Sequence, residues 1–320
     1  MVSPRVLTFG ETMGLVVVPR GESLREAATA RLRTAGAEST VAIGLRRLGI
    51  EASWAGVVGA DGVGERVLRD LRGEGVDLAA ARVESTAPTG LMLRELRPTS
   101  TRVTYYRHGS AGSTIAPADV DAAFDACRPD LVHLTGITAA LSDSGESAVR
   151  RAVERARQDG VTISLDVNHR PTLPGSARGA AAVAALLPEV DLLFVGDDEL
   201  AVLNPHLAGE RDPEAAAVRL ARAGVGEVVV KLGSRGALAH VAGATRRAEA
   251  ERVPVVDVIG AGDSFVAGYL AARLSSADVA DRLRWGTVAA ACTVASPGDW
   301  EGLPTRDELA RYGGQHRTER

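Results

Sequence analysis

The 320-residue chain has little cysteine, few aromatic residues and no long apolar run. Its two cysteines, Cys127 and Cys292, lie far apart without the spacing of metal ligands, so we expect reduced thiols in a reducing compartment and no disulfide. Aromatic residues make up 3% of the chain and hydrophobic residues 45%, which predicts a core of alanine, valine and leucine. No apolar stretch reaches ~18 residues and no hydrophobic N-terminal segment is present, which indicates a soluble, cytoplasmic protein without a membrane span.

An excess of positive charge is also missing. The formal net charge is −4, from 37 basic and 41 acidic residues. No basic run suggests nucleic acid as a partner, so phosphates would have to be bound at a local site. Of the basic residues only Lys231 is a lysine. A bias toward arginine explains this skew without any function, whereas a lysine at a strand end before a glycine loop is also a candidate phosphate partner.

Two nucleotide-binding signatures are absent. No G-x-G-x-x-G follows a predicted strand, which disfavours a dinucleotide-dependent dehydrogenase, and no G-x-x-x-x-G-K-[ST] is present, which disfavours a P-loop enzyme.

Short apolar runs alternate with helical patterns over the second half of the chain. The runs cover residues 131–137, 161–166, 190–195 and 228–232, and helices are predicted at about 144–159, 178–187 and 213–223. This alternation predicts a mainly parallel sheet with helices on both faces. Because such sheets bind ligands at the carboxyl ends of their strands, the pattern selects Gly136 and residues 166–170, 196–199 and 231–236.

The first hundred residues follow a different pattern. Strands are predicted at residues 6–10 and 14–19, and a hairpin with a proline-containing turn at 89–107. Residues 20–33 are weakly patterned and are interpreted as including loop. The early strands and the hairpin would form a small sheet that projects from the main body.

The stretch DVIGAGDSFVAG, at residues 257–268, carries the clearest chemical signal. The β-branched run at 253–256 precedes it as a strand or extended segment, and a helix is predicted to begin near Ala261. Gly260 and Gly262 would let backbone N–H groups approach a phosphate at the positive end of the helix dipole. Asp263 lies in the same turn and would accept a proton from a hydroxyl that attacks phosphorus. The alternative is that Asp263 only complements the helix dipole.

This stretch resembles the second signature, D-x-x-G-A-G-D-x-F, of the ribokinase-like (PfkB) carbohydrate kinases. The resemblance implies an α/β fold, a three-layer α/β/α sandwich with a mainly parallel central sheet and a small β lid. It implies one domain over residues 1–320, with lid segments at about 12–36 and 88–110. ATP and Mg²⁺ would be the cofactors. Asp263 would be the catalytic base, and Gly260, Ala261 and Gly262 the anion hole.

Further motifs resemble the substrate side of this family. Residues 35–42 resemble the first signature, G-G-A-x-x-N-x-A, with Thr40 in place of its asparagine, and residues 105–113 resemble the 2-keto-3-deoxygluconate kinases. Met92 stands where many of these kinases have an aromatic lid residue. The simpler interpretations are a helix N-terminus and an edge strand with a solvated arginine. The resemblance implies a substrate site formed by Gly36, Ala37, Tyr105, Arg107, Arg170, Asp263 and Asp299.

The nucleotide side resembles the family in a similar way. Residues 166–170 match D-x-N-x-R, where Arg170 would also serve catalysis. Glu199 would help to place Mg²⁺ through water, with Gly196 in place of the family's asparagine; a helix N-terminal acidic cluster is the alternative. The implied ATP-binding residues are Asn168, Gly196, Lys231, Gly233, Ser234, Gly236, Gly260, Gly262 and Thr287.

These observations predict an ATP-dependent sugar kinase that acts on a primary hydroxyl, with 2-keto-3-deoxygluconate favoured as the small-molecule substrate. An Asp263 with an ordinary pKa near ~3.9 would be ionised at neutral pH, so no tuning is expected. The alternatives are a fructokinase or another PfkB sugar or nucleoside kinase, and a sugar-binding sensor on a kinase fold. Exposed edges of the lid favour a homodimer through it.

Overall fold

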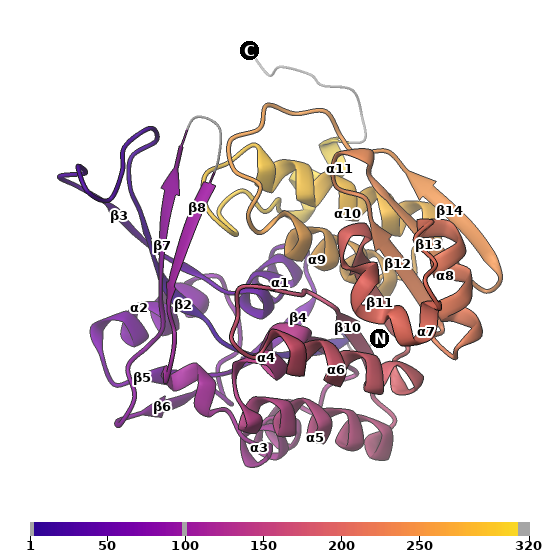
Figure 1. Ribbon diagram of the computed structural model, residues 1–320, viewed down its shortest axis with the longest axis horizontal. Helices are drawn as coiled ribbons and strands as arrows, with labels where there is room; N and C mark the ends of the chain where they lie inside the picture. Colours follow the sequence, from indigo (N-terminus) through magenta and orange to yellow (C-terminus); the bar gives the residue numbers. More distant parts are fainter. Residues whose placement is uncertain (1–2, 98–100, 313–320) are drawn as a thin grey trace.

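The computed structural model describes residues 3–97 and 101–312 (Figure 1). Its main sheet has eight strands in the order β14-β13-β12-β11-β10-β9-β1-β4. Every pair from β4 to β12 is parallel, whereas β13 runs antiparallel to both of its neighbours. The bounds are β1 (Arg5–Phe9), β4 (Glu51–Ala55), β9 (Leu131–Thr135), β10 (Thr162–Asp166), β11 (Leu192–Gly196), β12 (Glu227–Lys231), β13 (Ala237–Val241) and β14 (Ala244–Ala248).

The sheet separates two apolar cores. Along β1, Val6 faces one core, and Leu7 and Phe9 face the other, because successive side chains of a strand point to opposite faces. Burial on both faces explains why the central strands are continuous apolar runs in the sequence.

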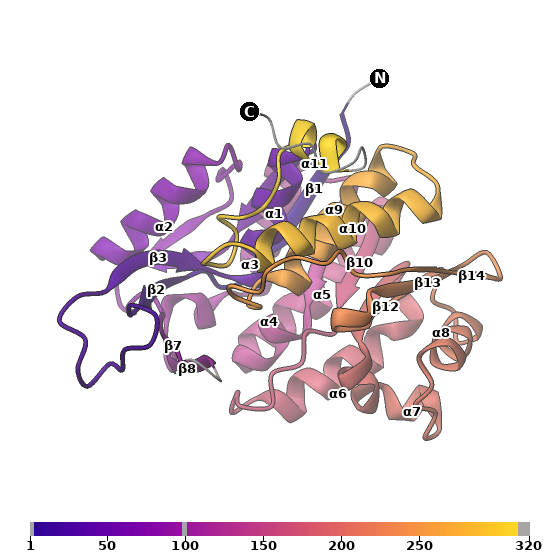
Figure 2. The same cartoon turned by 90° about the horizontal axis from the view of Figure 1, so that it is seen from above.

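Helices cover both faces of the sheet (Figure 2). This three-layer arrangement is the predicted fold class. None of the helices in residues 3–97 and 101–312 is long and apolar enough to cross a membrane. One face is covered by α1 (Ala37–Arg47), α2 (Gly62–Gly73), α9 (Ala261–Leu274), α10 (Val279–Val294) and α11 (Arg306–Tyr312), and the other by α3 (Pro117–Cys127), α4 (Gly136–Leu141), α5 (Asp143–Asp159), α6 (Ser176–Leu186), α7 (Asn204–Leu207) and α8 (Pro213–Arg222).

A second sheet, here called the lid sheet, stands beside the main body (Figure 1). Its order is β3-β2-β7-β8, with β2 (Met13–Val17) parallel to β7 (Leu91–Leu96) and the other pairs antiparallel. The remaining strands are β3 (Arg31–Ala35), β8 (Thr101–Tyr106) and the short parallel pair β5 (Val57–Gly59) and β6 (Arg82–Glu84).

Two weakly patterned segments take a definite form in the structure. The stretch at 20–33 includes loop as expected and ends in β3, whose weak pattern is explained by its position at the edge of the lid sheet, with Leu32 exposed. The run at 253–256, predicted to be a strand or an extended segment, forms no strand, and its Val253 and Val255 line a cavity. The predicted proline-containing turn falls on residues 98–100, which lie outside the described residues.

Candidate active site

The candidate site lies where three neighbouring parallel strands end. Asp166, Gly196 and Lys231 are the last residues of β10, β11 and β12. Because parallel strands carry their carboxyl ends at one edge of the sheet, the loops that follow them meet there. Four of the segments selected from the sequence therefore lie around one edge, with the start of α9 against them.

The start of α9 depends on Gly260. This residue has φ 78°, in the left-handed region, and a Cβ placed on it would lie 2.2 Å from the carbonyl oxygen of Asp299. A residue with a side chain would therefore be strained and would clash. Gly260 offers no side chain to cap the helix, so the dipole at this end is available to an anion.

Asp263 lies in the first turn of α9 and is half-buried. Its Oδ1 accepts a hydrogen bond from Nδ2 of Asn168 at 3.0 Å. Asn168 has φ 41°, an unusual value for a non-glycine residue, and its own N–H donates to Asp166 Oδ1 at 3.2 Å. The loop after β10 thus holds one oxygen of Asp263 in a fixed place.

The electrostatic surroundings of Asp263 raise its pKa to about 7. Burial is the main cause, because neighbouring atoms remove water from around the carboxylate. The negative charges of Asp166 and Asp299 act in the same direction, and the positive charges of Arg170 and Lys231 oppose them. The expectation of an ordinary pKa was therefore wrong.

Lys231 pairs with Asp166 near the carboxylate of Asp263. Its Nζ donates to both oxygens of Asp166, and that carboxylate is buried. Burial alone would lower the pKa of Lys231, but Asp166 and Glu199 outweigh it, so the pKa is raised and the lysine stays charged. A Cβ on Gly262 would lie 3.7 Å from Nζ, so the amine is adjacent to the helix start.

Glu199 joins two of the strand-end loops. One oxygen accepts the N–H of Gly196 and the other that of His169, both at 2.7 Å. Burial raises the pKa of Glu199, although Lys231 opposes the effect. Nη1 of Arg170 lies 4.0 Å from Oε1 of Glu199. The arginine side chain is 42% exposed, so this cation can reach other partners.

The arrangement of carboxylates bears on whether a metal could bind. Within residues 3–97 and 101–312, no group of three or more His, Cys, Asp or Glu side chains could hold a metal ion. Mg²⁺ commonly uses one or two carboxylates, with waters and substrate phosphates as the other ligands. Glu199, whose oxygens both already accept backbone N–H groups, fits contact through water better than direct ligation.

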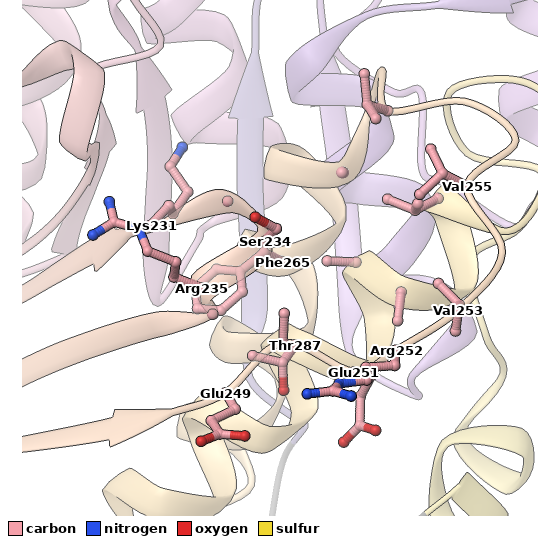
Figure 3. Close-up of a pocket in the computed structure, with 18 of the residues that line it drawn as sticks. Lys231, Ser234, Arg235, Glu249, Glu251, Arg252, Val253, Val255, Phe265 and Thr287 are labelled. Atoms are coloured by element: carbon pink, nitrogen blue, oxygen red, sulfur yellow. The ribbon is translucent and has the colours of Figure 1, made fainter.

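A cavity of about 800 Å³ opens beside the start of α9 (Figure 3). This volume is in the range of small-molecule sites. Val253 and Val255 form one wall, and Phe265 and Thr287 lie on the helices opposite. Asn168, Gly196 and Gly260, also predicted to bind ATP, are not among its lining residues. The predicted residues that line it are Lys231, Gly233, Ser234, Gly236, Ala261, Gly262 and Thr287.

Tyr105 and Arg107 lie together at the lid side of the site, with the guanidinium carbon 5.5 Å from the ring centroid. Arg107 is held by Glu11, whose Oε2 accepts from Nε at 2.7 Å. Glu11 is 2% exposed and also accepts a hydrogen bond from Ser110. Sequence reasoning missed Glu11, which lies two residues after the end of β1; its only signal was an acidic residue close to a strand end.

The first signature forms the N-terminus of α1. Gly36 precedes the helix and Ala37 is its first residue; a Cβ on Gly36 would lie 2.7 Å from the carbonyl oxygen of Glu11. The hydroxyl of Thr40, which replaces the family's asparagine, is buried and accepts or donates no hydrogen bond within the described chain. Met92 packs with Met13, Leu15 and Ala35 in the lid sheet.

Asp299, predicted to contact substrate, is buried and accepts a hydrogen bond from Arg94 of β7. Burial raises its pKa against the opposing charge of Arg94. The same guanidinium donates to Asp257 at 2.8 Å. Sequence reasoning missed Arg94, although an arginine within the apolar run of β7 was a visible signal.

Comparison with known proteins agrees with this geometry. The model of the pfkB family of carbohydrate kinases matches residues 3–306. The 2-dehydro-3-deoxygluconokinase of Bacillus subtilis (strain 168) is 36% identical over 316 residues, covering 98% of this chain and 96% of the relative. The PfkB protein of Polaromonas sp. JS666 superposes with a TM-score of 0.85 at 34% identity, covering 97% and 99% of the two chains. The structure of 2-dehydro-3-deoxygluconokinase from Thermotoga maritima has the same fold, with a TM-score of 0.85 at 22% identity, covering 97% of this chain and 98% of that one.

The chain therefore belongs to the pfkB family, and it is an ATP-dependent carbohydrate kinase. The predicted ribokinase-like fold class and the resemblance that led to it are confirmed.

Proposed function

We propose that this kinase phosphorylates a primary hydroxyl of 2-keto-3-deoxygluconate, with Asp263 as the general base. The observation that carries the proposal is the position of Asp263. It is half-buried at a glycine-lined helix start, beside a cavity of about 800 Å³, and has a pKa of about 7. A base is most effective when its pKa lies near the working pH, so this carboxylate suits proton transfer at neutrality.

In the proposed step the substrate hydroxyl gives its proton to Asp263 while its oxygen attacks the γ-phosphorus of ATP. The bond between the γ-phosphorus and the bridging oxygen breaks, and ADP leaves with the electron pair. Asn168 holds Asp263 Oδ1, which leaves Oδ2 for the hydroxyl. The amides of residues 260–262, at the positive end of α9, offset the charge that develops on the phosphoryl group, and Arg170 adds a cation.

The proposal assigns ATP to the cavity beside α9. Lys231, Gly233, Ser234 and Gly236 would lie along the phosphates, and Thr287 near the base. Asn168 and Gly196 would contact the phosphates from the strand-end loops and not from the cavity wall. Mg²⁺, contacted through water by Glu199, would neutralise phosphate charge.

Three features support a deoxy sugar acid as substrate. Arg107 supplies a cation for a carboxylate, next to the ring of Tyr105, and the phenol of Tyr105 and the carboxylate of Asp299 are the proposed partners of hydroxyls. Met92 lies opposite Tyr105 in the lid sheet and packs with Met13 and Leu15, so this region suits a carbon without a hydroxyl. The third feature is the 36% identity to a 2-dehydro-3-deoxygluconokinase. That name describes a kinase of the same compound, because 2-dehydro-3-deoxygluconate is another name for 2-keto-3-deoxygluconate.

A panel of substrates tests this assignment. ATP consumption would be measured with 2-keto-3-deoxygluconate, fructose and ribose, and we expect the keto acid to have the highest kcat/KM. A higher kcat/KM for fructose or ribose would replace this substrate with a neutral sugar. If calorimetry detected sugar binding and no sugar caused ATP turnover, the chain would be a sensor.

We place the enzyme in the cytoplasm, because ATP is supplied there. We also propose that two chains form a homodimer through the lid sheet. Tyr106 of β8 and Leu32 of β3 are 62% and 44% exposed on its two edge strands. Paired edges would cover these side chains. Light scattering of the purified chain should give twice the mass of one chain, and a monomer would contradict this part.

A further inference from the structure

Arg94 is a fully buried charge on the lid sheet. Its side chain has no exposed surface, and neither has that of Asp257, while Asp299 retains 9%. Nη1 donates to Asp257 Oδ2 at 2.8 Å and Nη2 donates to Asp299 Oδ1. A buried arginine is costly unless its N–H groups are paired, and Nε has no partner within the described residues. An apolar side chain would fill the same space without the desolvation free energy that a buried charge costs.

The two carboxylates flank the turn that begins α9. Asp257 lies three residues before Gly260, and its Oδ1 accepts the N–H of Ile259 at 3.1 Å. Asp299 touches the turn through its backbone, because its carbonyl oxygen fills the place of a Cβ on Gly260. One guanidinium therefore connects strand β7 to both sides of this turn.

Arginine is suited to this connection. Its planar fork presents two N–H groups to two acceptors at once, and it stays charged at any relevant pH. A lysine would keep the charge, but its single amine is a weaker match for two separate acceptors.

A second cluster of charged residues, built around the buried Glu227, serves as a comparison. Glu227, at the start of β12, accepts from Arg273 at 3.0 Å and from Arg282 at 3.1 Å. These residues join β12 to the far end of α9 and to α10, all within the main body. The cluster anchors α9 without reaching the lid sheet or the turn at Gly260.

We propose that Arg94 is a positioning residue that fixes the turn at residues 260–262 in its place relative to the lid sheet. The anion hole is then complete only when the lid is seated beside it. This inference rests on the proposed function for its catalytic consequence, but the mechanical connection is independent of the substrate.

Kinetics test the catalytic consequence through Arg94→Met, Arg94→Lys and the control Arg273→Met. We expect Arg94→Met to lower kcat by about tenfold or more, as for an interaction made in the transition state. The KM for ATP should stay within about twofold, since Arg94 does not line the nucleotide cavity. Arg94→Lys should recover part of kcat. Arg273→Met should lower the melting temperature and leave kcat unchanged. An Arg94→Met enzyme with wild-type kcat would overturn the inference.

Amide hydrogen exchange tests the connection without any substrate. Peptides that cover residues 257–263 should exchange faster in Arg94→Met than in the wild type, and Arg273→Met should leave them unchanged. Unchanged exchange in Arg94→Met refutes the connection, even if the wild type phosphorylates the keto acid. Conversely, a wild type that phosphorylates no sugar refutes the proposed function and leaves this measurement valid.

If Arg94→Met fails to fold, the double variant Arg94→Met/Asp257→Asn replaces it, because it removes one uncompensated buried carboxylate. The same acceleration of exchange is expected there. Wild-type exchange in a folded double variant would overturn the inference.

Discussion

Lys231 Nζ donates hydrogen bonds to both oxygens of Asp166, at 2.8 and 2.6 Å, between the ends of two strands that β11 separates. The pair places a cation at the wall of the cavity beside α9, where its charge also acts on Asp263. It also balances the charge of a carboxylate that would otherwise be buried without a cation.

Replacing Lys231 with Met should therefore affect both stability and nucleotide binding. The free energy of unfolding should fall by about 1–3 kcal/mol, because Asp166 loses its partner. The KM for ATP should rise, because the cavity loses one of the cations that line it. Calorimetric melting and ATP titration measure the two effects. Lys231→Arg, which keeps the charge, is the control, and unchanged values in Lys231→Met would contradict the role.

Replacing Asp263 with Asn should remove the proposed base while keeping the shape of the side chain. We expect kcat to fall by about 10²–10⁴. Asp281→Asn is a matched control, because Asp281 lies in the first turn of α10, and its side chain accepts a hydrogen bond from Arg284 of the same helix. If Asp263→Asn kept as much activity as Asp281→Asn, Asp263 would be a dipole partner and not a base.

The raised pKa of Asp263 predicts an acid limb in the pH profile. Below a pH of about 7 the carboxyl becomes protonated and cannot accept the proton, so kcat/KM for the sugar should fall about tenfold per pH unit. Replacing Arg170 with Met removes a cation that lowers this pKa, so the limb should move to higher pH. A profile that is flat down to pH 5 would contradict the assignment.

The same pKa predicts an effect on stability. Because the folded pKa is about 7 and the unfolded value is near ~3.9, the folded state binds more protons between these values, and stability falls as the pH rises through this window. Asparagine does not titrate in this range, so Asp263→Asn removes this loss of stability. Its melting temperature should exceed that of the wild type by about 1–3 °C at pH 8, with a smaller difference at pH 5. A variant that melts lower at pH 8 would refute the raised pKa.

Arg107 should distinguish acidic from neutral substrates. Replacing it with Met should weaken binding of the keto acid by about 10–100-fold, as for the loss of a charged hydrogen bond, and should leave any residual activity on fructose unchanged. The substitution also leaves Glu11 buried without its cation, so Arg107→Met/Glu11→Gln is the control for stability. Equal losses on both substrates would show that Arg107 does not recognise a carboxylate.

The fold class and the position of the helix start were predictable because they depend on local patterns. Apolar runs mark the central strands, and the glycines before Asp263 mark a close approach of backbone and ligand. The predicted pairing of Tyr105 and Arg107 also follows from one strand. Partners that come from distant segments were not predictable: Asp166 and Lys231 are 65 residues apart, and Arg94 and Asp299 are 205 apart. Nor could the sequence indicate how strongly burial perturbs Asp263, since that depends on the packing around it.

The solitary lysine has a practical consequence for handling this enzyme. Apart from the α-amino group, the chain offers acylating dyes and amine-coupling surfaces only the amine of Lys231. Its ion pair with Asp166 and its raised pKa keep that amine protonated and therefore slow to react, so these reagents should modify the α-amino group and leave the cavity beside α9 free.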